Sequence, residues 1–352
     1  MGAGCHQGAR SDVGGRAGSD TRGAVVVKIG LCAWSFTGSH RTAGREPDPH
    51  LAGGLLALTN QYGLASIEGA SGWFEGMNET QISDFQRSLG SKGIFVDTGG
   101  QNYAEDLTPL TQAIEVAVRM GSPVVRTTIS GLLEGDRRSL GFQGWRDHLA
   151  NLVKPLQRAA AAAQEAGVVI GIENHQDICS HELAWLCEQI GGSQVGVTMD
   201  VGNAYAVGET PASFARRVQP FLKHVHLKDY TVHPTESGYR LKRCALGDGI
   251  VDWPAMLAWF DAECPQLEGC IELGATTARH IRLFEPSWWE TYPERPFIPD
   301  AIEALGDLQR AAQPAGTDWR TPHEAEESAD VCALYEIDQI ERSVAYLKSI
   351  SF

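Results

Sequence analysis

The sequence predicts an α/β fold of the (β/α)8 TIM-barrel type with a helical extension at its C-terminal end. Short apolar runs alternate with longer helical stretches, and successive runs start 26–48 residues apart. Eight such runs fall within about 240 residues, close to the roughly 250 residues of a typical barrel. A doubly wound open sheet, the alternative, would carry a Gly-rich phosphate loop after its first strand, and none is present there.

The eight runs are rich in Val and Ile and are too short for typical helices, so each is expected to form a buried parallel strand. They are Lys28–Phe36, Leu64–Ala70, Gly93–Gly100, Pro123–Ser130, Val168–His175, Val195–Asn203, Phe221–Tyr230 and Gly269–Ala275. Between them, Leu107–Met120 and Trp145–Ala166 have the clearest helical composition, and a Gly follows each directly.

The chain is expected to form one domain. Residues 1–24 are Gly-rich and unpatterned and predict a disordered leader, whereas 25–352 form the barrel with a C-terminal extension over 276–352. In that extension the aromatic segment 285–299 is expected to be a lid, an aromatic platform or an interface arm. Ala329–Ser349 predicts an amphipathic helix. Its barrel-facing residues are expected to be Val331, Leu334, Tyr335, Ile337, Ile340, Val344 and Leu347.

Composition excludes several classes of protein. Lys and Arg total 29 against 44 Asp and Glu, and the formal net charge of −15 argues against a nucleic-acid partner. No apolar run approaches the roughly 20 residues that cross a bilayer, so no membrane partner is expected. The eight Cys form no CxxC pair, which predicts reduced thiols and a cytoplasmic protein.

The active-site residues of a TIM barrel lie at the C-terminal ends of its strands. In the second half of this chain, four successive strand ends carry two Glu, one Asp and one His that can converge at the mouth. They are Glu173, Asp200, His226 and Glu272. Three carboxylates and one imidazole favour Mn²⁺, with Co²⁺, Mg²⁺ or Zn²⁺ as alternatives. Without a cation, the three carboxylates would repel one another.

The motifs G-I-E-N-H, M-D-V-G-N, H-V-H-L-K-D, L-G-D-G-x-V-D-W and I-E-L together resemble the sugar phosphate isomerase/epimerase superfamily, the xylose isomerase-like barrels. The resemblance covers roughly residues 28–275. It implies that the same four residues bind one divalent metal. It also implies that Glu173 and Glu272 act as the acid/base pair that moves a proton on and off carbon.

The resemblance therefore implies a metal-dependent isomerase or epimerase acting on a sugar or sugar phosphate, with a possible homo-oligomeric state. A lyase or dehydratase acting on 3-oxo-glycosides or keto-cyclitols could use the same site, because proton abstraction next to a carbonyl is common to both reactions. A non-catalytic sugar-binding protein is a third hypothesis, against which the intact ligand set argues.

Further residues at the strand ends are candidates for substrate contact. His175 lies two residues after Glu173 and is expected to point to the same side of its strand, as a base or a hydrogen-bond donor. Substrate anchors or supporting residues are Lys228, Arg243, Arg126, Trp34 and His224. Glu68 and Gln101 could line the opposite wall, and packing or N-capping is the preferred interpretation of Glu68.

The endonuclease IV branch of the superfamily shares the V-H-L-K-D-like and M-D-V-G-N motifs. Its three-metal site needs further Asp and His ligands, at positions where this chain has Asn203, Leu241 and Arg243. Those ligands are missing, so a DNA repair activity is not expected.

Overall fold

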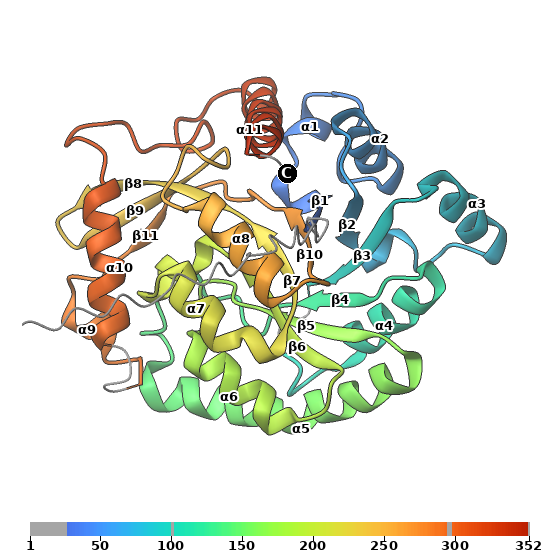
Figure 1. Ribbon diagram of the computed structural model, residues 1–352, viewed down its shortest axis with the longest axis horizontal. Helices are drawn as coiled ribbons and strands as arrows, with labels where there is room; N and C mark the ends of the chain where they lie inside the picture. The colour runs from blue at the N-terminus through green and yellow to red at the C-terminus, as the bar shows by residue number, and fades with distance from the viewer. Residues whose placement is uncertain (1–26, 100–101, 294–297, 351–352) are drawn as a thin grey trace, which may run out of the picture.

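The computed structural model describes residues 27–99, 102–293 and 298–350, in which eight parallel strands close into a barrel (Figure 1). In chain order they are β1 (Lys28–Cys32), β2 (Ser66–Ala70), β3 (Gly93–Thr98), β4 (Val124–Thr127), β5 (Val169–Glu173), β6 (Val195–Asp200), β7 (Leu222–Leu227) and β10 (Glu268–Ile271). Strand β1 pairs with both β2 and β10, which closes the ring and confirms the predicted fold class. The predicted leader and Gln101 lie outside the described residues.

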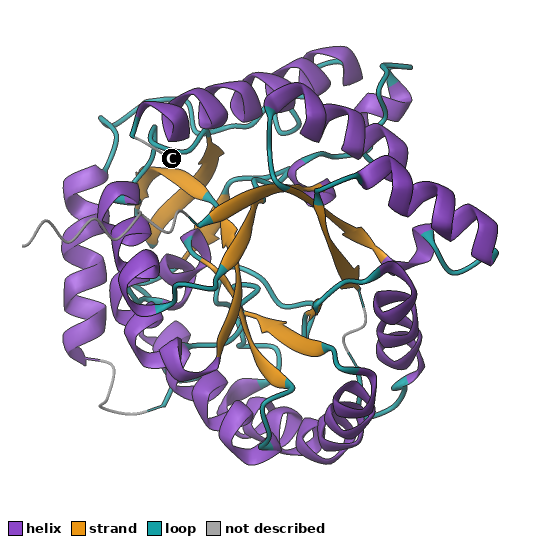
Figure 2. Cartoon of the chain, turned by 45° about the vertical axis from the view of Figure 1, so that its right-hand side comes forward, coloured by secondary structure: helices purple, strands orange, loops and turns teal. Residues whose placement is uncertain are grey.

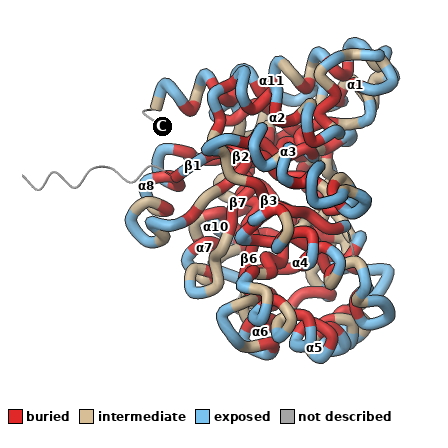
Figure 3. Tube along the Cα trace, turned by 90° about the vertical axis from the view of Figure 1, so that its right-hand side faces the viewer, coloured by how far each residue is buried: buried red, intermediate tan, exposed pale blue. Residues whose placement is uncertain are grey.

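Helices surround the barrel and cover the outer face of its strands, whose inner face points into the barrel (Figure 2). The α-helices are α1 (Ser39–Thr42), α2 (Ala52–Tyr62), α3 (Glu79–Leu89), α4 (Thr108–Met120), α5 (Gly141–Ala166), α6 (Ser180–Ile190), α7 (Pro211–Val218), α8 (Trp253–Glu263), α9 (Pro286–Trp289), α10 (Ile298–Ala311) and α11 (Ala329–Ser349). Short 3-10 turns are η1 (Ala33–Ser35), η2 (Ser71–Trp73), η3 (Gly202–Val207) and η4 (Gln219–Phe221). Figure 3 shows the resulting layers, with buried strands inside and exposed residues on the outer helices.

The apolar runs became strands because both of their faces are buried. All six residues of β6 are buried, including the polar Thr198 and Asp200. The helices that precede β4 and β5 end at Gly121 (φ 76°) and Gly167 (φ 69°), whose left-handed backbone turns the chain back toward the barrel. The predicted helices in these two places are confirmed, although α5 starts four residues earlier than the sequence indicated.

A three-stranded antiparallel sheet that the sequence did not predict lies beside the barrel. It consists of β8 (Asp229–Thr235), β9 (Gly238–Cys244) and β11 (Arg279–Ile281), in the order β11-β9-β8. The predicted run Phe221–Tyr230 is therefore two strands, since β7 ends at Leu227. The β8–β9 hairpin turns at Gly238 (φ 152°), where a Cβ would lie 2.2 Å from the carbonyl oxygen of Ile281.

The last helix, α11, is predicted correctly, and its buried face is predicted in part, since Ile340, Val344 and Leu347 are buried as expected. Val331 and Leu334, which were expected to face the barrel, are 42% and 46% exposed. The buried face includes polar side chains that bond to neighbouring loops: Glu336 accepts from the backbone N–H of Thr37, and Ser343 accepts from that of Leu246. Apolar periodicity alone misplaces such a face, because hydrogen-bonded polar residues occupy part of it.

Two rings of the aromatic segment 285–299 pack into protein, and residues 294–297 of this segment lie outside the described ones. Trp288 and Tyr292 are buried and stack with ring centroids 4.4 Å apart. The Tyr292 hydroxyl donates to the carbonyl of Gly135 (2.8 Å), and the Arg137 guanidinium lies 3.7 Å from the Tyr292 ring centroid. These two rings therefore hold the extension against the loop that follows β4, and do not offer a free face to a ligand.

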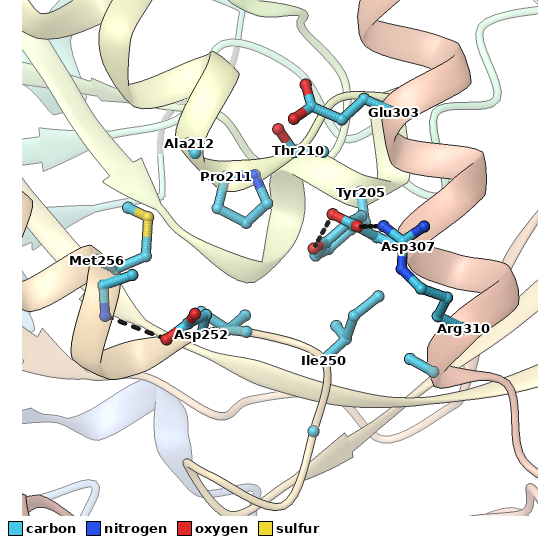
Figure 4. Close-up of a pocket in the computed structure, with 14 residues that line it drawn as sticks. Tyr205, Thr210, Pro211, Ala212, Ile250, Asp252, Met256, Glu303, Asp307 and Arg310 are labelled. Atoms are coloured by element: carbon cyan, nitrogen blue, oxygen red, sulfur yellow. Dashed lines mark hydrogen bonds and ion pairs between the residues drawn. The ribbon is translucent and has the colours of Figure 1, made fainter.

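A cavity of ≈ 490 Å³ lies on the outer side of the ring, between η3, α7, the N-terminal end of α8 and α10 (Figure 4). Tyr205, Asp307 and Arg310 form one of its walls, where the Tyr205 hydroxyl donates to Asp307 at 3.3 Å. None of the four predicted metal ligands lines this cavity.

In the described residues, no helix is long and apolar enough to cross a bilayer.

Asp229 anchors the loop between β9 and α8. Its fully buried carboxylate accepts hydrogen bonds from the backbone N–H groups of Gly247 (3.0 Å) and Val251 (3.1 Å) and from Nε1 of Trp253 (3.0 Å). The Asp of the H-V-H-L-K-D motif is therefore structural.

We predict that Asp229→Ala lowers the free energy of unfolding by about 3 kcal/mol, because buried donors lose their acceptor. The matched variant Asp248→Ala, in the same loop, removes a solvent-exposed pair with Arg342 and should cost less than about 1 kcal/mol. Urea denaturation of both variants measures the difference, and equal losses would contradict the assignment.

Candidate metal centre

The four predicted ligands converge at the C-terminal ends of their strands. Each offers one ligand atom, and these atoms all lie within 4.8 Å of one another. The residues are Glu173 at the end of β5, Asp200 at the end of β6, His226 in β7 and Glu272 directly after β10. All four are buried, so their charges need compensation.

Three of the four residues have a buried polar atom without a hydrogen-bond partner. These atoms are Glu173 Oε1, Asp200 Oδ1 and His226 Nδ1. The distance between Glu173 Oε1 and His226 Nδ1 is 4.0 Å, too long for a hydrogen bond but suitable for two ligands of one ion. Unpartnered lone pairs aimed at a common point fit a divalent cation. This donor set is hard and rich in oxygen.

Glu68 fixes the orientation of His226. Both carboxylate oxygens of Glu68 lie within hydrogen-bond distance of His226 Nε2 (2.9 and 3.0 Å), and Oε2 is also 3.0 Å from Nε2 of His224. An ionised carboxylate only accepts hydrogen bonds, so each Nε2 carries the proton. In a neutral His226 ring, Nδ1 would then present its lone pair to a cation bound between the four residues.

The charge of Glu68 agrees with this role. Burial alone would raise the pKa of its carboxyl, but His226 and His224 together hold that pKa well below its usual range. The preferred interpretation from sequence, packing or N-capping, is wrong, because Glu68 lies within β2 and its carboxylate holds two imidazoles. The signal was a carboxylate inside an apolar strand.

Arg126 bridges two carboxylates at the mouth. Its Nη1 lies 3.0 Å from both oxygens of Asp97, and its Nη2 is paired with Glu173. Asp97 also accepts a hydrogen bond from Nε1 of Trp34 (2.7 Å), whose side chain is 40% exposed. The sequence suggested Arg126 as a substrate anchor, and the structure places it where it compensates the charge of Glu173.

Lys228 bridges the other two carboxylates of the predicted ligand set, Asp200 and Glu272. Its Nζ lies 3.0 Å from Asp200 Oδ2 and is also paired with Glu272. Burial would raise the pKa of Glu272, but Lys228 and the other nearby cations lower it overall. Burial outweighs the attraction of Lys228 at Asp200 and raises the pKa of that carboxyl to about 6. An added cation would stabilise the ionised form of Asp200.

Amides and a phenol hold Asp200 in place. Asn174 exchanges two hydrogen bonds with the backbone of Asp200 (2.7 and 2.9 Å), and Nδ2 of Asn203 donates to Oδ2 (2.7 Å). The hydroxyl of Tyr230 in turn donates to Oδ1 of Asn203 (3.0 Å). Tyr230 was not among the predicted site residues, although it follows the H-V-H-L-K-D motif directly.

The remaining candidates lie at different depths. His175 is half-buried, and its Nδ1 has no partner. His224 is fully buried against Glu68 and Phe95, which favours support of His226 over substrate contact. Arg243 is buried under α11, where Nε donates to Gln339 (2.7 Å) and Nη2 to the carbonyl of Ser35 (3.0 Å).

Two other groups of potential ligands lie deeper in the barrel. Cys32 with Glu68 and His226, and Cys270 with Glu68 and His224, also come within metal-binding reach. Both depend on Glu68, whose oxygens are already bonded to the imidazoles. The two thiols are buried, and burial raises the pKa of each well above its usual value, which disfavours the thiolate.

Comparison with known proteins supports the fold. The profile of the family described as the xylose isomerase-like TIM barrel matches residues 25–264. An uncharacterized Escherichia coli K12 protein, YihM, is 24% identical over 181 residues, which are 51% of this chain and 52% of YihM. The chain thus aligns with about half the length of this curated relative.

Two solved structures show the same architecture. D-psicose 3-epimerase from Clostridium cellulolyticum H10 has a TM-score of 0.54 at 12% identity, over 81% of this chain and 99% of that one. The 3-keto-D-glucoside 4-epimerase YcjR from E. coli has a TM-score of 0.53 at 12% identity, with the same coverage of both chains. At this level of identity the likeness shows the fold alone.

We predict that Glu68→Gln weakens Mn²⁺ binding by about 10- to 100-fold, because the amide no longer fixes the tautomer of His226. Titration calorimetry of the metal-free protein measures the affinity, and circular dichroism checks that the fold is kept. The exposed Glu79→Gln is the matched control and should bind Mn²⁺ like the unmodified chain. Unchanged affinity in Glu68→Gln would exclude the positioning role.

His175 is expected to stay neutral between pH 5 and 8. Burial and the charges of Arg126, Lys228 and Arg279 lower its pKa to about 3. Since the protonated form is disfavoured only in the folded chain, this residue lowers stability as the pH falls from its unfolded pKa, about 6.5, toward 3. An NMR titration assigned with His175→Gln should show no shift of its Cε1–H signal above pH 5. A midpoint near 6.5 would contradict the assignment.

Proposed function

The chain belongs to the xylose isomerase-like TIM-barrel family. We propose that it is a metal-dependent enzyme that removes a proton from the carbon next to a sugar carbonyl and then returns a proton to the substrate. The observation that carries this proposal is the convergence of four ligand side chains, three of which have buried, unpartnered lone pairs. The names of the structural relatives, a ketose epimerase and a keto-glucoside epimerase, support a sugar as the substrate class.

The donor set favours Mn²⁺ as the proposed cofactor, with Co²⁺, Mg²⁺ or Zn²⁺ as alternatives. When bound, such a cation polarises a carbonyl and orients neighbouring sugar oxygens. Glu173, Asp200, His226 and Glu272 would hold it. Arg126 and Lys228 would remain beside the carboxylates and limit their repulsion.

Glu173 and Glu272 are the proposed acid and base. Strands β6 and β7 separate β5 from β10 in the barrel, so the two carboxylates approach the centre from different sides. This arrangement suits proton removal on one face of a sugar carbon and return on the other, which would be an epimerisation. The carboxylate that removes the proton must be ionised, a form that Arg126 favours at Glu173 and Lys228 at Glu272, while the one on the other face must start protonated to return a proton.

Two residues at the mouth complete the proposed site. A neutral His175 can donate or accept a hydrogen bond with a sugar hydroxyl. The exposed indole of Trp34, held by Asp97, offers an apolar face for the sugar ring. Trp34 lies in η1, directly after β1, and His175 lies two residues after the end of β5. Both are therefore at the C-terminal ends of strands, where a barrel enzyme has its active site.

We predict that Glu272→Gln lowers kcat/KM by at least about 100-fold, since a positioned acid or base contributes about 10²–10⁴ in rate. The circular dichroism spectrum of the variant should match that of the unmodified protein. The matched control is Glu268→Gln. Glu268 pairs with Lys28 at the N-terminal ends of β10 and β1, away from the predicted ligands, and its loss should leave turnover unchanged. Near-full activity of Glu272→Gln would remove this residue from the mechanism.

Incubating the Mn²⁺-loaded protein with a panel of ketoses and keto-glycosides in D₂O tests the reaction class. We expect exchange of the C–H next to the carbonyl, read by proton NMR, with an epimeric or isomeric product. Loss of water or of an aglycone would instead identify the lyase alternative. A protein that binds no divalent metal and exchanges no C–H would overturn the proposal.

A further inference from the structure

The β11-β9-β8 sheet turns one face toward the metal centre. Residues directly opposite in antiparallel strands share a face, and Leu241 of β9 lies opposite both Val232 of β8 and Arg279 of β11. Tyr230 belongs to the same face by alternation, and its hydroxyl bonds to Asn203, which bonds to the ligand Asp200. Strand β11 also contacts η3, which follows Asp200.

Arg279 differs from the other members of this face. Val232, Leu241 and Tyr230 are fully buried, whereas Arg279 is half-buried. Its Nε is buried without a partner, and its Nη1 makes only a long hydrogen bond, 3.4 Å, to the hydroxyl of Thr277. Among the residues that the structure describes, no carboxylate oxygen lies within 4.0 Å of this guanidinium.

The two cations beside the predicted ligands are neutralised by carboxylates. Arg126 is paired with Asp97 and Glu173, and Lys228 with Asp200 and Glu272. Strand β11, which carries Arg279, contacts η3, which begins two residues after the predicted ligand Asp200. Arg279 also shares its sheet face with Tyr230, so it lies on the side of the sheet that faces the four predicted ligands. A half-buried positive charge loses hydration and, with no carboxylate beside it, is left for an external anion.

We propose that Arg279 binds an anionic group of the sugar substrate, a carboxylate or a phosphate, at the mouth of the barrel. This inference rests on the proposed function and deepens it, because it restricts the substrate to acidic sugars. The fork of a guanidinium matches the oxygens of both anions. The proposal also explains how an anion could approach a mouth that contains several carboxylates.

Arg243 adds to the positive potential of this face. It lies two residues along β9 from Leu241 and has no carboxylate partner within 4.0 Å among the described residues. Its Nη1 is buried and unpartnered. Arg243 itself is enclosed under α11, so Arg279 is the cation that can reach a ligand.

The test uses three sugars that differ only at one end. D-fructose is neutral there, D-fructose 6-phosphate carries a phosphate and D-fructuronate carries a carboxylate. With the Mn²⁺-loaded full chain in D₂O, kcat/KM for C–H exchange is measured for each sugar. We expect one anionic sugar to be preferred over D-fructose, and that sugar identifies the source of the anion.

The variant Arg279→Gln should reduce this preference by about 10- to 100-fold, the value of a charge-assisted hydrogen bond. The matched control is Arg240→Gln. Arg240 lies on the opposite face of the same sheet, stacked on Trp319 at 3.9 Å, and its loss should leave the preference unchanged. Titration calorimetry of the metal-free proteins with the same sugars measures anion binding without turnover.

Equal turnover of the three sugars, or an unchanged preference in Arg279→Gln, would overturn the inference. If no sugar exchanges a proton, the proposed function fails, and calorimetry then decides the inference separately. Tighter binding of an anionic sugar that is lost in Arg279→Gln and kept in Arg240→Gln would uphold it. Equal binding of charged and neutral sugars would refute it.

Discussion

Burial of like charges is the constraint on which the site depends. Five carboxylates, those of Glu68, Asp97, Glu173, Asp200 and Glu272, are each at most 5% exposed. Buried carboxylates that repel one another must be neutralised or protonated. The barrel brings them together because parallel strands end at the same edge, so the fold that creates the site also creates its electrostatic problem.

The five carboxylates are compensated in more than one way, by imidazoles or by shared cations. Glu68 is held by two imidazoles, Asp97 by Arg126, and Asp200 and Glu272 share Lys228. Arg126 and Lys228 each serve two carboxylates, so two positive charges face four negative ones. After this pairing, Glu173 and Asp200 each keep one buried oxygen without a hydrogen-bond partner. In the proposed enzyme a divalent cation would supply the missing charge, and an anionic group of the substrate would neutralise Arg279.

Much of this site could be predicted from sequence, because the barrel rule converts strand ends into neighbours. The convergence of the four predicted ligands and the number of barrel strands followed from the positions of the apolar runs and of the residues at their ends. A carboxylate inside an apolar strand marked Glu68 as unusual, but its bonds to His224 and His226 could not be predicted, since they depend on which side chains meet inside the barrel. The β8–β9 hairpin was not predicted because Lys228 alone separates β7 from β8, so the two strands appear in the sequence as one apolar run. The buried face of α11 includes Glu336 and Ser343, whose partners come from distant loops.

The central claim is that these buried charges are arranged around one divalent cation. A crystal structure of the Mn²⁺-loaded protein with anomalous scattering at the manganese edge tests it most directly. The account predicts one strong peak about 2.0–2.3 Å from Glu173 Oε1, Asp200 Oδ1, His226 Nδ1 and an oxygen of Glu272. Coordination by Nε2 of His226, or a peak at the buried cysteines with none between the four ligands, would contradict it.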